Sequence, residues 1–229
     1  MQPKLLGSAL ATASGRLARR TDDRLRGLSI REMPRSTARR EVHRAREDVD
    51  AALWRDLRGC IEGRNPWPAL LAGPTGCGKT CAALALADEV RGPVRYDRMP
   101  DLCDALIECQ QGTALDEWSG PERRCTPALF WANYRRYMLC IIDEIGVADP
   151  VSNHHYLTLL AALEARHGAG LVLVTNQRRD GIVRLYDERL VSRAYSGTVL
   201  LLDGPDRRYI HDHDDDRRTN TTETKSIPF

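Results

Sequence analysis

The sequence predicts an α/β fold in which helices cover both faces of a parallel β-sheet. Three observations lead to this fold class. Short apolar runs alternate with alanine-rich or amphipathic segments along most of the chain, which is the pattern of strands and helices in such folds. A glycine-rich loop, residues 73–80, joins the first apolar run to the first alanine-rich segment. Two adjacent acids, Asp143 and Glu144, end a later apolar run.

The composition is that of an ordinary globular protein. The chain has 229 residues, of which 42% are hydrophobic and 29% are charged, so we expect one domain with appendages or at most two small domains. No apolar run approaches the roughly 20 residues that span a bilayer, and this argues against a transmembrane protein. The seven cysteines show neither C-x-x-C nor zinc-finger spacing, and the N-terminus lacks the sustained apolar region of a secretory signal. We therefore expect a cytoplasmic protein with reduced thiols.

The charge is unevenly distributed along the chain. The formal net charge is +2, but residues 1–64 hold 15 Lys+Arg and 9 Asp+Glu, a balance of +6, which leaves residues 65–229 at −4. A basic segment of this kind suits an acidic protein surface or nucleic acid. The alternative is a basic helix whose charged side chains are simply solvated and bind no partner.

Residues 1–64 are expected to form a basic, mainly helical N-terminal region. Residues 1–35 are arginine-rich and loosely structured, whereas residues 36–62 carry apolar residues at helical spacing and could begin at a cap on Ser36 or Thr37. An asparagine and two prolines follow, so we place a domain boundary near residue 64.

Residues 65–210 are expected to form the core, and residues 211–229 a disordered polar tail. Within the core most of the expected strands are short apolar runs, and the expected helices are alanine-rich or carry apolar residues at helical spacing. Residues 111–126 are polar and rich in Gly and Pro, which indicates a loop or insertion. The expected strands are 69–72, 94–97, 138–142, 171–175 and 198–202, and the expected helices are 80–91, 100–110, 127–137, 154–167 and 180–195.

The loop at residues 73–80 reads GPTGCGKT and matches the phosphate-binding pattern G-x-x-x-x-G-K-[ST]. Glycines let the backbone wrap closely round phosphate oxygens, and the N-terminus of the next helix attracts an anion. Lys79 would place a positive charge on the terminal phosphates, and the Thr80 hydroxyl can bind Mg²⁺. Only three of the 34 basic residues are lysines, and Lys79 is the only one between residues 65 and 210, where phosphate chemistry prefers a compact ammonium. The predicted ATP-binding residues are Gly73, Pro74, Thr75, Gly76, Cys77, Gly78, Lys79 and Thr80, together with Asp143.

The acids after the strand at 138–142 face the crevice where open α/β sheets bind ligands. We expect Asp143 and Thr80 to bind Mg²⁺ and Glu144 to orient and deprotonate the water that attacks the γ-phosphate. A bland alternative is that the two acids are simply the polar end of a strand.

Two further candidates lie later in the chain. Asn176 directly follows the strand at 171–175 and could position the attacking water, although asparagine also favours turns. Arg189 and Arg193 lie four residues apart on one helical face, and an arginine near a γ-phosphate would stabilise transition-state charge. With 31 arginines in the chain, the alternative is ordinary surface decoration.

The segments GPTGCGKT, LCIIDEIG, VLVTNQ and YDERLVSR, in this order, resemble the AAA+ ATPases of the bacterial helicase-loader type. That group includes the DnaC-like loaders and the IstB-like transposition helpers, and the resemblance covers about residues 65–210. It implies that Lys79 and Thr80 are the Walker A residues, and that Asp143 and Glu144 are the Walker B pair. It also implies that Asn176 is sensor I, and that Arg193, with Arg189 as a second candidate, is an arginine finger reaching into the next subunit of a homo-oligomer with ATP at its interfaces.

The resemblance further implies an ATPase that loads or remodels a replicative DNA helicase on single-stranded DNA, with the N-terminal region docking on the partner. The compact size also suits a phage-encoded loader. Alternatives are an IstB-like helper that recruits a transposase, a nucleotide switch that barely hydrolyses ATP, and a P-loop small-molecule kinase, against which the paired acids and arginines argue. The sequence departs from the family after the last strand, where a helical lid is not expected. Arg207 or Arg208 matches the sensor II arginine of the family only weakly.

A candidate contact for single-stranded DNA lies in and after the insertion, because arginines interleaved with aromatic residues suit single strands. The alternative is that Phe130, Tyr134 and Tyr137, at helical spacing, belong to the core. The candidate residues are Arg123, Arg124, Phe130, Trp131, Arg135 and Arg136.

Overall fold

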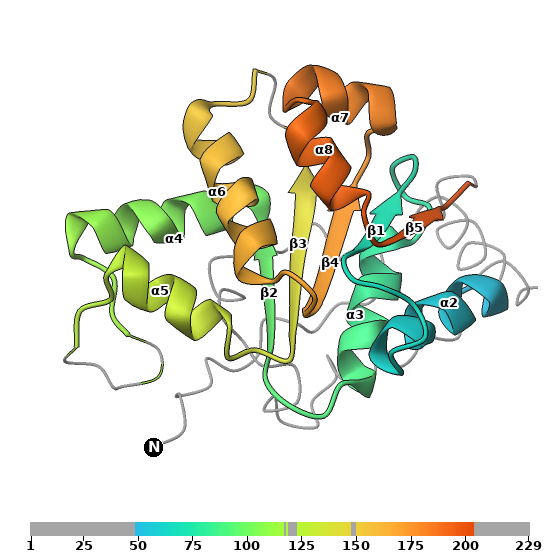
Figure 1. Ribbon diagram of the computed structural model, residues 1–229, viewed down its shortest axis with the longest axis horizontal. Coiled ribbons are helices and arrows are strands. Elements are labelled where there is room, and N and C mark those ends of the chain that lie inside the picture. Colours follow the sequence, from blue (N-terminus) through green and yellow to red (C-terminus); the bar gives the residue numbers. More distant parts are fainter. Residues whose placement is uncertain (1–48, 117, 119–122, 148–149, 204–229) are drawn as a thin grey trace, which may run out of the picture.

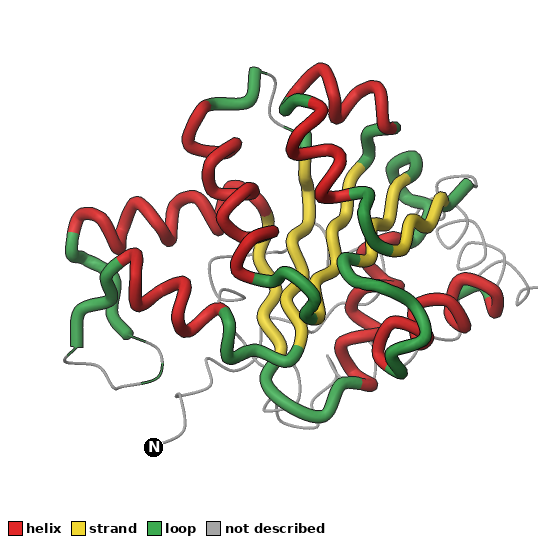
Figure 2. Tube along the Cα trace, viewed as in Figure 1, coloured by secondary structure: helices red, strands yellow, loops and turns green. Residues whose placement is uncertain are grey.

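Five parallel strands form one sheet in the order β2-β3-β4-β1-β5, and helices cover both of its faces (Figures 1 and 2). The computed structural model describes residues 49–116, 118, 123–147 and 150–203. This architecture confirms the predicted α/β fold class. The strands are β1 (Ala69–Ala72), β2 (Val94–Arg98), β3 (Leu139–Ile145), β4 (Gly170–Thr175) and β5 (Thr198–Leu201). The helices are α2 (Ala51–Ile61), α3 (Lys79–Glu89), α4 (Met99–Gln111), α5 (Pro127–Tyr134), α6 (Asn153–Ala165), α7 (Arg179–Leu185) and α8 (Glu188–Ala194).

The strand order decides which loops meet. Strand β1 pairs with β4 on one side and with β5 on the other, so β4 separates β1 from β3. Because every pair is parallel, the carboxyl ends of all five strands lie along one edge of the sheet. Helices α7 and α8 lie at this edge, at the end to which β3 points in Figure 1.

Two apolar clusters fill the space on the two faces of the sheet. In β1, Ala69 and Leu71 belong to the cluster under α2 and α3, whereas Leu70 between them belongs to the cluster under helices α4 to α8. Side chains alternate in direction along a strand, so a four-residue apolar run serves both clusters. This explains why β1 is a continuous apolar run in the sequence.

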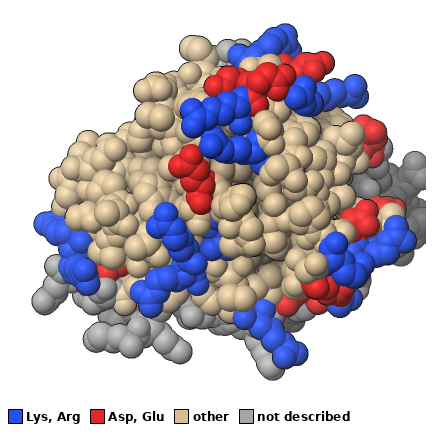
Figure 3. All heavy atoms as spheres, viewed as in Figure 1, with Lys and Arg blue, Asp and Glu red and all other residues tan. Residues whose placement is uncertain are grey.

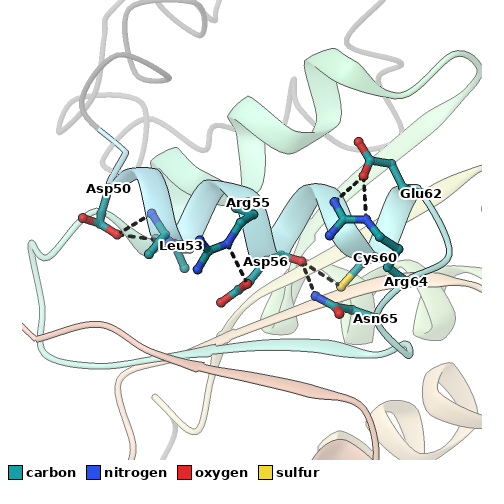
Figure 4. A network of polar contacts seen from close by, with 9 residues as sticks. Asp50, Leu53, Arg55, Asp56, Cys60, Glu62, Arg64 and Asn65 are labelled. Carbon is teal, nitrogen blue, oxygen red and sulfur yellow. Dashed lines mark hydrogen bonds and ion pairs between the residues drawn. The ribbon is translucent and has the colours of Figure 1, made fainter.

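Helix α2 begins later than expected. We predicted a helix over residues 36–62, but Asp50 adopts an extended conformation and caps α2 instead. Its Oδ1 accepts hydrogen bonds from the N–H groups of Ala52 at 2.9 Å and Leu53 at 3.0 Å (Figure 4). Asp50 thus satisfies two amides that a helix start leaves without partners. The cap expected at Ser36 or Thr37, like the rest of residues 1–48, lies outside the described residues.

The C-terminal end of α2 is tied to the turn that follows it. The side-chain amide of Asn65 donates to the carbonyl oxygen of Asp56 at 2.8 Å, and the Arg64 guanidinium pairs with Glu62 (Figure 4). Leu57 and Cys60 are buried in the same cluster as α3 and β1. The last helix of the expected N-terminal region therefore packs on the sheet. The domain boundary near residue 64 stays a prediction, and the expected tail at 211–229 is not among the described residues.

Helix α5 ends at Tyr134, three residues earlier than predicted, and Arg166 gives the physical reason. The buried guanidinium of Arg166 donates to the carbonyl oxygens of Tyr134 at 3.4 Å and Tyr137 at 2.8 Å. These carbonyl groups are thereby satisfied without a further helical turn. Tyr134 and Tyr137 are buried, as is Phe130, so the core interpretation of these three aromatic residues is confirmed.

The expected helix over residues 180–195 is in fact two helices. It breaks at Tyr186 and Asp187, where Asp187 adopts a φ of 153° and caps α8 by accepting the N–H of Leu190 at 2.8 Å. The hydroxyl of Tyr156 in α6 donates to the other oxygen of Asp187 at 3.0 Å. An aspartate inside an apolar periodic segment is a sequence signal for such a cap, and the prediction of a single helix did not take Asp187 into account. Across the described ranges, no helix is both long and apolar enough to cross a membrane.

Candidate nucleotide-binding site

The glycine-rich loop joins the end of β1, at Ala72, to the start of α3, at Lys79. Gly78 has a φ of 96°, a left-handed conformation that glycine adopts without strain. A Cβ atom on Gly73 would clash with the backbone carbonyl of Leu202 at the end of β5. Both positions therefore require glycine for structural reasons, and the loop is held close to the neighbouring strand.

The side chain of Lys79, the first residue of α3, reaches back into the loop. Its ammonium donates to the carbonyl oxygens of Gly73 at 2.8 Å and Pro74 at 2.6 Å, and the side chain is only 5% exposed. Cys77 is also buried, with its Sγ 3.6 Å from the same nitrogen. The loop thus encloses a single buried cation, while Pro74 and Thr75 are exposed on its outer side.

The first turn of α3 reaches the acidic end of β3. The Thr80 hydroxyl donates to Oδ2 of Asp143 at 2.7 Å. The Tyr96 hydroxyl, from β2, donates to the same oxygen at 2.9 Å, and the backbone N–H of Glu144 donates to Oδ1 at 2.7 Å. Thr80 and Tyr96, which precede Asp143 by 63 and 47 positions in the sequence, therefore both contact its carboxylate.

Burial governs the protonation of the groups around this carboxylate. Burial raises the pKa of Asp143, while the hydrogen bonds from Thr80, Glu144 and Tyr96 and the charge of Lys79 act in the opposite direction. Burial, followed by the neighbouring Asp143 carboxylate, also raises the pKa of Glu144, and the Arg98 guanidinium lowers it. Burial and then Asp143 raise the pKa of Tyr96 well above 10. Tyr96 is thus a hydrogen-bond donor at neutral pH.

Glu144 occupies a strained position in a β-bulge. The register between β3 and β4 shifts between Ile142, opposite Leu173, and Ile145, opposite Thr175, so β3 has one extra residue. Glu144 has a φ of 61°, which costs a non-glycine residue about 1–3 kcal/mol. Bulges redirect side chains next to active sites, and a strained carboxylate beside the buried Asp143 fits a catalytic role. We had expected β3 to end at residue 142; the strand instead continues through both acids.

Asn176 is placed as expected, directly after β4. Thr175 lies opposite Ala72 in the sheet, and the N–H of Gly73 donates to the Thr175 carbonyl oxygen at 3.4 Å. Asn176, which is exposed, therefore follows the residue that binds the start of the glycine-rich loop. Its role as a sensor stays a prediction.

The two candidate arginine fingers lie on α8, which packs against α6 and α7. Arg193 is half-buried and its Nη2 lies 3.7 Å from Oε1 of Glu164 in α6, whereas Arg189 is exposed. Blue and red side chains mix at the top of Figure 3, over α7 and α8. The ion pairs of these helices include Arg179 in α7 with Glu188 in α8, at 2.8 Å. The structure connects neither candidate to the glycine-rich loop of the same chain, and their action on a neighbouring subunit stays a prediction.

Two residues of β2 near the site were not found from the sequence. Tyr96 contacts Asp143, and Arg98 lies opposite Asp143 in the sheet and forms a forked pair with Asp101 at 2.8 and 2.9 Å. The segment VRYDR shows only an alternation of charged and other residues. Its pairing with β3 is a tertiary property, and only that pairing would have pointed to these side chains.

The site has ligands suited to Mg²⁺. A hydroxyl oxygen and a buried carboxylate lie 2.7 Å apart at Thr80 and Asp143, and Mg²⁺ is commonly bound by one or two such protein oxygens with phosphates and waters. Within the described ranges, no group of three or more His, Cys, Asp or Glu residues could hold a metal by itself. The residues present thus fit a metal that binds together with a nucleotide.

Comparisons with known proteins agree with this architecture. A scan against protein-family models gives no match, and neither does a search of curated proteins. Among solved structures, the chain is similar to DnaA from Aquifex aeolicus bound to AMPPCP, with a TM-score of 0.55, 17% identity, and 80% of this chain and 54% of that chain covered. It is also similar to DnaA bound to AMPPCP and single-stranded DNA (TM-score 0.55, 16% identity, 77% and 53% covered) and to DnaI (TM-score 0.52, 17% identity, 74% and 93% covered).

These likenesses concern the fold. The described residues have the AAA+ fold. The chain spans about half the length of the two DnaA structures that it matches. Within the AAA+ fold of this chain, the glycine-rich loop, Thr80, Asp143 and Glu144 lie together at the carboxyl edge of the sheet.

Proposed function

We propose that this protein binds and hydrolyses ATP. The observation that carries the proposal is the meeting of the loop around Lys79 with the Thr80–Asp143 pair and Glu144 at one edge of the sheet. Each group has a chemical task for which its place is suited, and the bound nucleotide in two similar folds, both DnaA, supports the same reading.

Different residues of this chain carry out different parts of phosphoryl transfer. The loop amides and the Lys79 ammonium bind the β- and γ-phosphates, where Lys79 exchanges its carbonyl partners for phosphate oxygens. Glu144 accepts a proton from water as the water oxygen bonds to the γ-phosphorus and the bond to the β–γ bridging oxygen breaks, which gives ADP and phosphate. Thr80 and Asp143 would hold Mg²⁺, which when bound neutralises charge on the phosphates. Asn176 and, from a neighbouring subunit, Arg193 or Arg189 complete the proposed site.

Nucleotide binding and hydrolysis can be tested separately. Lys79→Ala should abolish binding of a fluorescent ATP analogue, whereas Glu144→Gln should bind the analogue as well as the parent protein does and lose at least about 100-fold in kcat. An exposed arginine on α7, Arg184, provides a control variant, Arg184→Ala, that should keep both activities. Normal turnover by either site variant would refute the assignment.

The proposed arginine finger predicts complementation between inactive subunits. Lys79→Ala lacks a working site but keeps its finger, and Arg193→Ala has the opposite defect. A mixture of the two should regain part of the ATPase rate, because one type of interface joins a working site to a working finger. Failure of the mixture to regain activity, with both variants assembled, would remove Arg193 from this role. The same experiment with Arg189→Ala tests the second candidate.

We further propose that the ATPase loads or remodels a replicative DNA helicase on single-stranded DNA, in the cytoplasm and as a homo-oligomer. The sequence resemblance to helicase loaders, the basic balance of residues 1–64 and the fold shared with DnaI and DnaA support it. Affinity capture with the Glu144→Gln form and ATP should retain the assembled state and bring down a replicative helicase, and Lys79→Ala should not. Capture of a transposase, with ATP-dependent filaments on duplex DNA, would instead favour the IstB-like role.

A further inference from the structure

We propose that Tyr96 is a positioning residue for Asp143 and determines how much Mg²⁺ the nucleotide site requires. The inference rests on the proposed function, because it assumes that ATP and Mg²⁺ bind at this edge of the sheet. Nothing in the phosphate-binding pattern or in the acidic pair of the sequence refers to Tyr96. Its place follows from the pairing of β2 with β3 alone.

The geometry of the carboxylate gives Tyr96 a distinct part. Oδ2 of Asp143 accepts two hydroxyl groups, Thr80 at 2.7 Å and Tyr96 at 2.9 Å, while Oδ1 accepts the N–H of Glu144 at 2.7 Å. Three donors, from α3, β2 and the backbone of β3, leave the carboxylate little freedom to rotate. Thr80 is itself an expected Mg²⁺ ligand, and the Glu144 amide is part of the strained bulge. Tyr96 is therefore the donor whose contribution is orientation and not direct binding.

Packing fixes the phenol in this place. Tyr96 is 7% exposed and belongs to the apolar cluster between the sheet and helices α2 and α3. A side chain with two rotatable bonds that is held by its ring has few other positions for its hydroxyl group. A carboxylate ordered in advance binds a metal better than one that must first be oriented, because the loss of freedom has already occurred on folding.

The expected effect concerns the metal and not the nucleotide. Tyr96→Phe removes one hydrogen bond to a charged group and keeps the ring. The Mg²⁺ concentration that gives half of the maximal Mg²⁺-dependent change in mant-ATP binding should therefore rise about tenfold. Nucleotide affinity in EDTA should be unchanged, because Tyr96 has no contact with the glycine-rich loop among its hydrogen bonds to described residues. A purely structural role would raise the Mg²⁺ requirement and lower the nucleotide affinity in EDTA together.

Tyr134→Phe is the matched control. Tyr134 is fully buried, and its hydroxyl has no nitrogen or oxygen partner among the described residues. This variant also removes one buried hydroxyl group, but on the other face of the sheet, in the cluster under α4 to α8. It should leave the Mg²⁺ requirement at the wild-type value.

The experiment measures binding of the fluorescent analogue mant-ATP to the full chain, first in EDTA and then with increasing MgCl2, with thermal unfolding as a check on folding. A raised Mg²⁺ requirement in Tyr96→Phe alone supports the proposal. An unchanged requirement in Tyr96→Phe, or an equal rise in Tyr134→Phe, overturns it while the ATPase proposal stands. If the wild-type protein does not bind mant-ATP at all, the proposed function fails, and this inference fails with it.

Discussion

The ion pair between Arg95 and Asp97 in β2 is buried, and breaking it should be among the most destabilising single changes in the described chain. Arg95 Nε lies 2.7 Å from one oxygen of Asp97, and Nη2 lies 3.0 Å from the other. The two side chains are 3% and 0% exposed. The guanidinium also lies over the rings of Phe130, Tyr134 and Tyr137, at 4.9, 5.6 and 5.9 Å from their centroids.

The magnitude follows from the two hydrogen bonds and the burial. Each bond joins charged groups and contributes about 1.5–3 kcal/mol. Asp97→Asn keeps one acceptor oxygen but turns an amide N–H toward the guanidinium and removes the carboxylate charge beside the buried Arg95. We therefore expect a loss of about 3 kcal/mol in the free energy of unfolding, within the range of about 3–5 kcal/mol for breaking a buried pair. For a chain of this length that corresponds to a fall of about 6–12 °C in Tm.

Urea unfolding followed by tryptophan fluorescence provides the measurement. The exposed pair of Arg179 and Glu188, whose side chains are 52% and 64% exposed, supplies the control. Glu188→Gln should change the free energy by less than about 1 kcal/mol. Replacing both buried charges, in Arg95→Met with Asp97→Leu, should recover most of the loss, because both members of the buried pair are then replaced by apolar side chains. If Asp97→Asn were as mild as Glu188→Gln, β2 would not be packed as described.

Three further outcomes follow from individual positions. Leu57→Ala should lower the free energy of unfolding by about 2–5 kcal/mol in a urea titration, because Leu57 is fully buried against α3; a change below about 0.5 kcal/mol would show that α2 does not pack there. Gly78→Ala should lower stability by about 1–3 kcal/mol and weaken nucleotide binding, because alanine is strained at a φ of 96°; unimpaired binding of mant-ATP would contradict this. Burial raises the pKa of Cys140 to about 12, so about one thiol in ten thousand is ionised at pH 8. Iodoacetamide at that pH should label the partly exposed Cys81 well before Cys140, as read by mass spectrometry of the peptides, and comparable labelling of both in the folded protein would be inconsistent with the core.

The sequence predicted those elements and loops whose structure depends on residues close together in the chain. The phosphate-binding pattern requires glycines and a lysine within eight residues, so the loop around Lys79 could be identified directly. The positions of the five strands were also predicted, and for β1, β3 and β4 the signal was a continuous apolar run, which is typical of strands buried on both faces. Errors arose where a single polar side chain ends an element. Asp50 and Asp187 each cap a helix inside a segment whose apolar spacing suggested one longer helix.

The sequence by itself determined the order of the elements, the glycine-rich loop and the position of the two acids, because each depends on neighbours within a few residues. Tertiary structure alone decided what surrounds Asp143. Thr80 and Tyr96 reach it from 63 and 47 residues away, and the bulge that strains Glu144 exists only in the register between β3 and β4. Two charged residues of VRYDR, Arg95 and Asp97, form a buried ion pair next to aromatic rings. Strand pairing and packing fix such contacts, and no spacing within one segment encodes them.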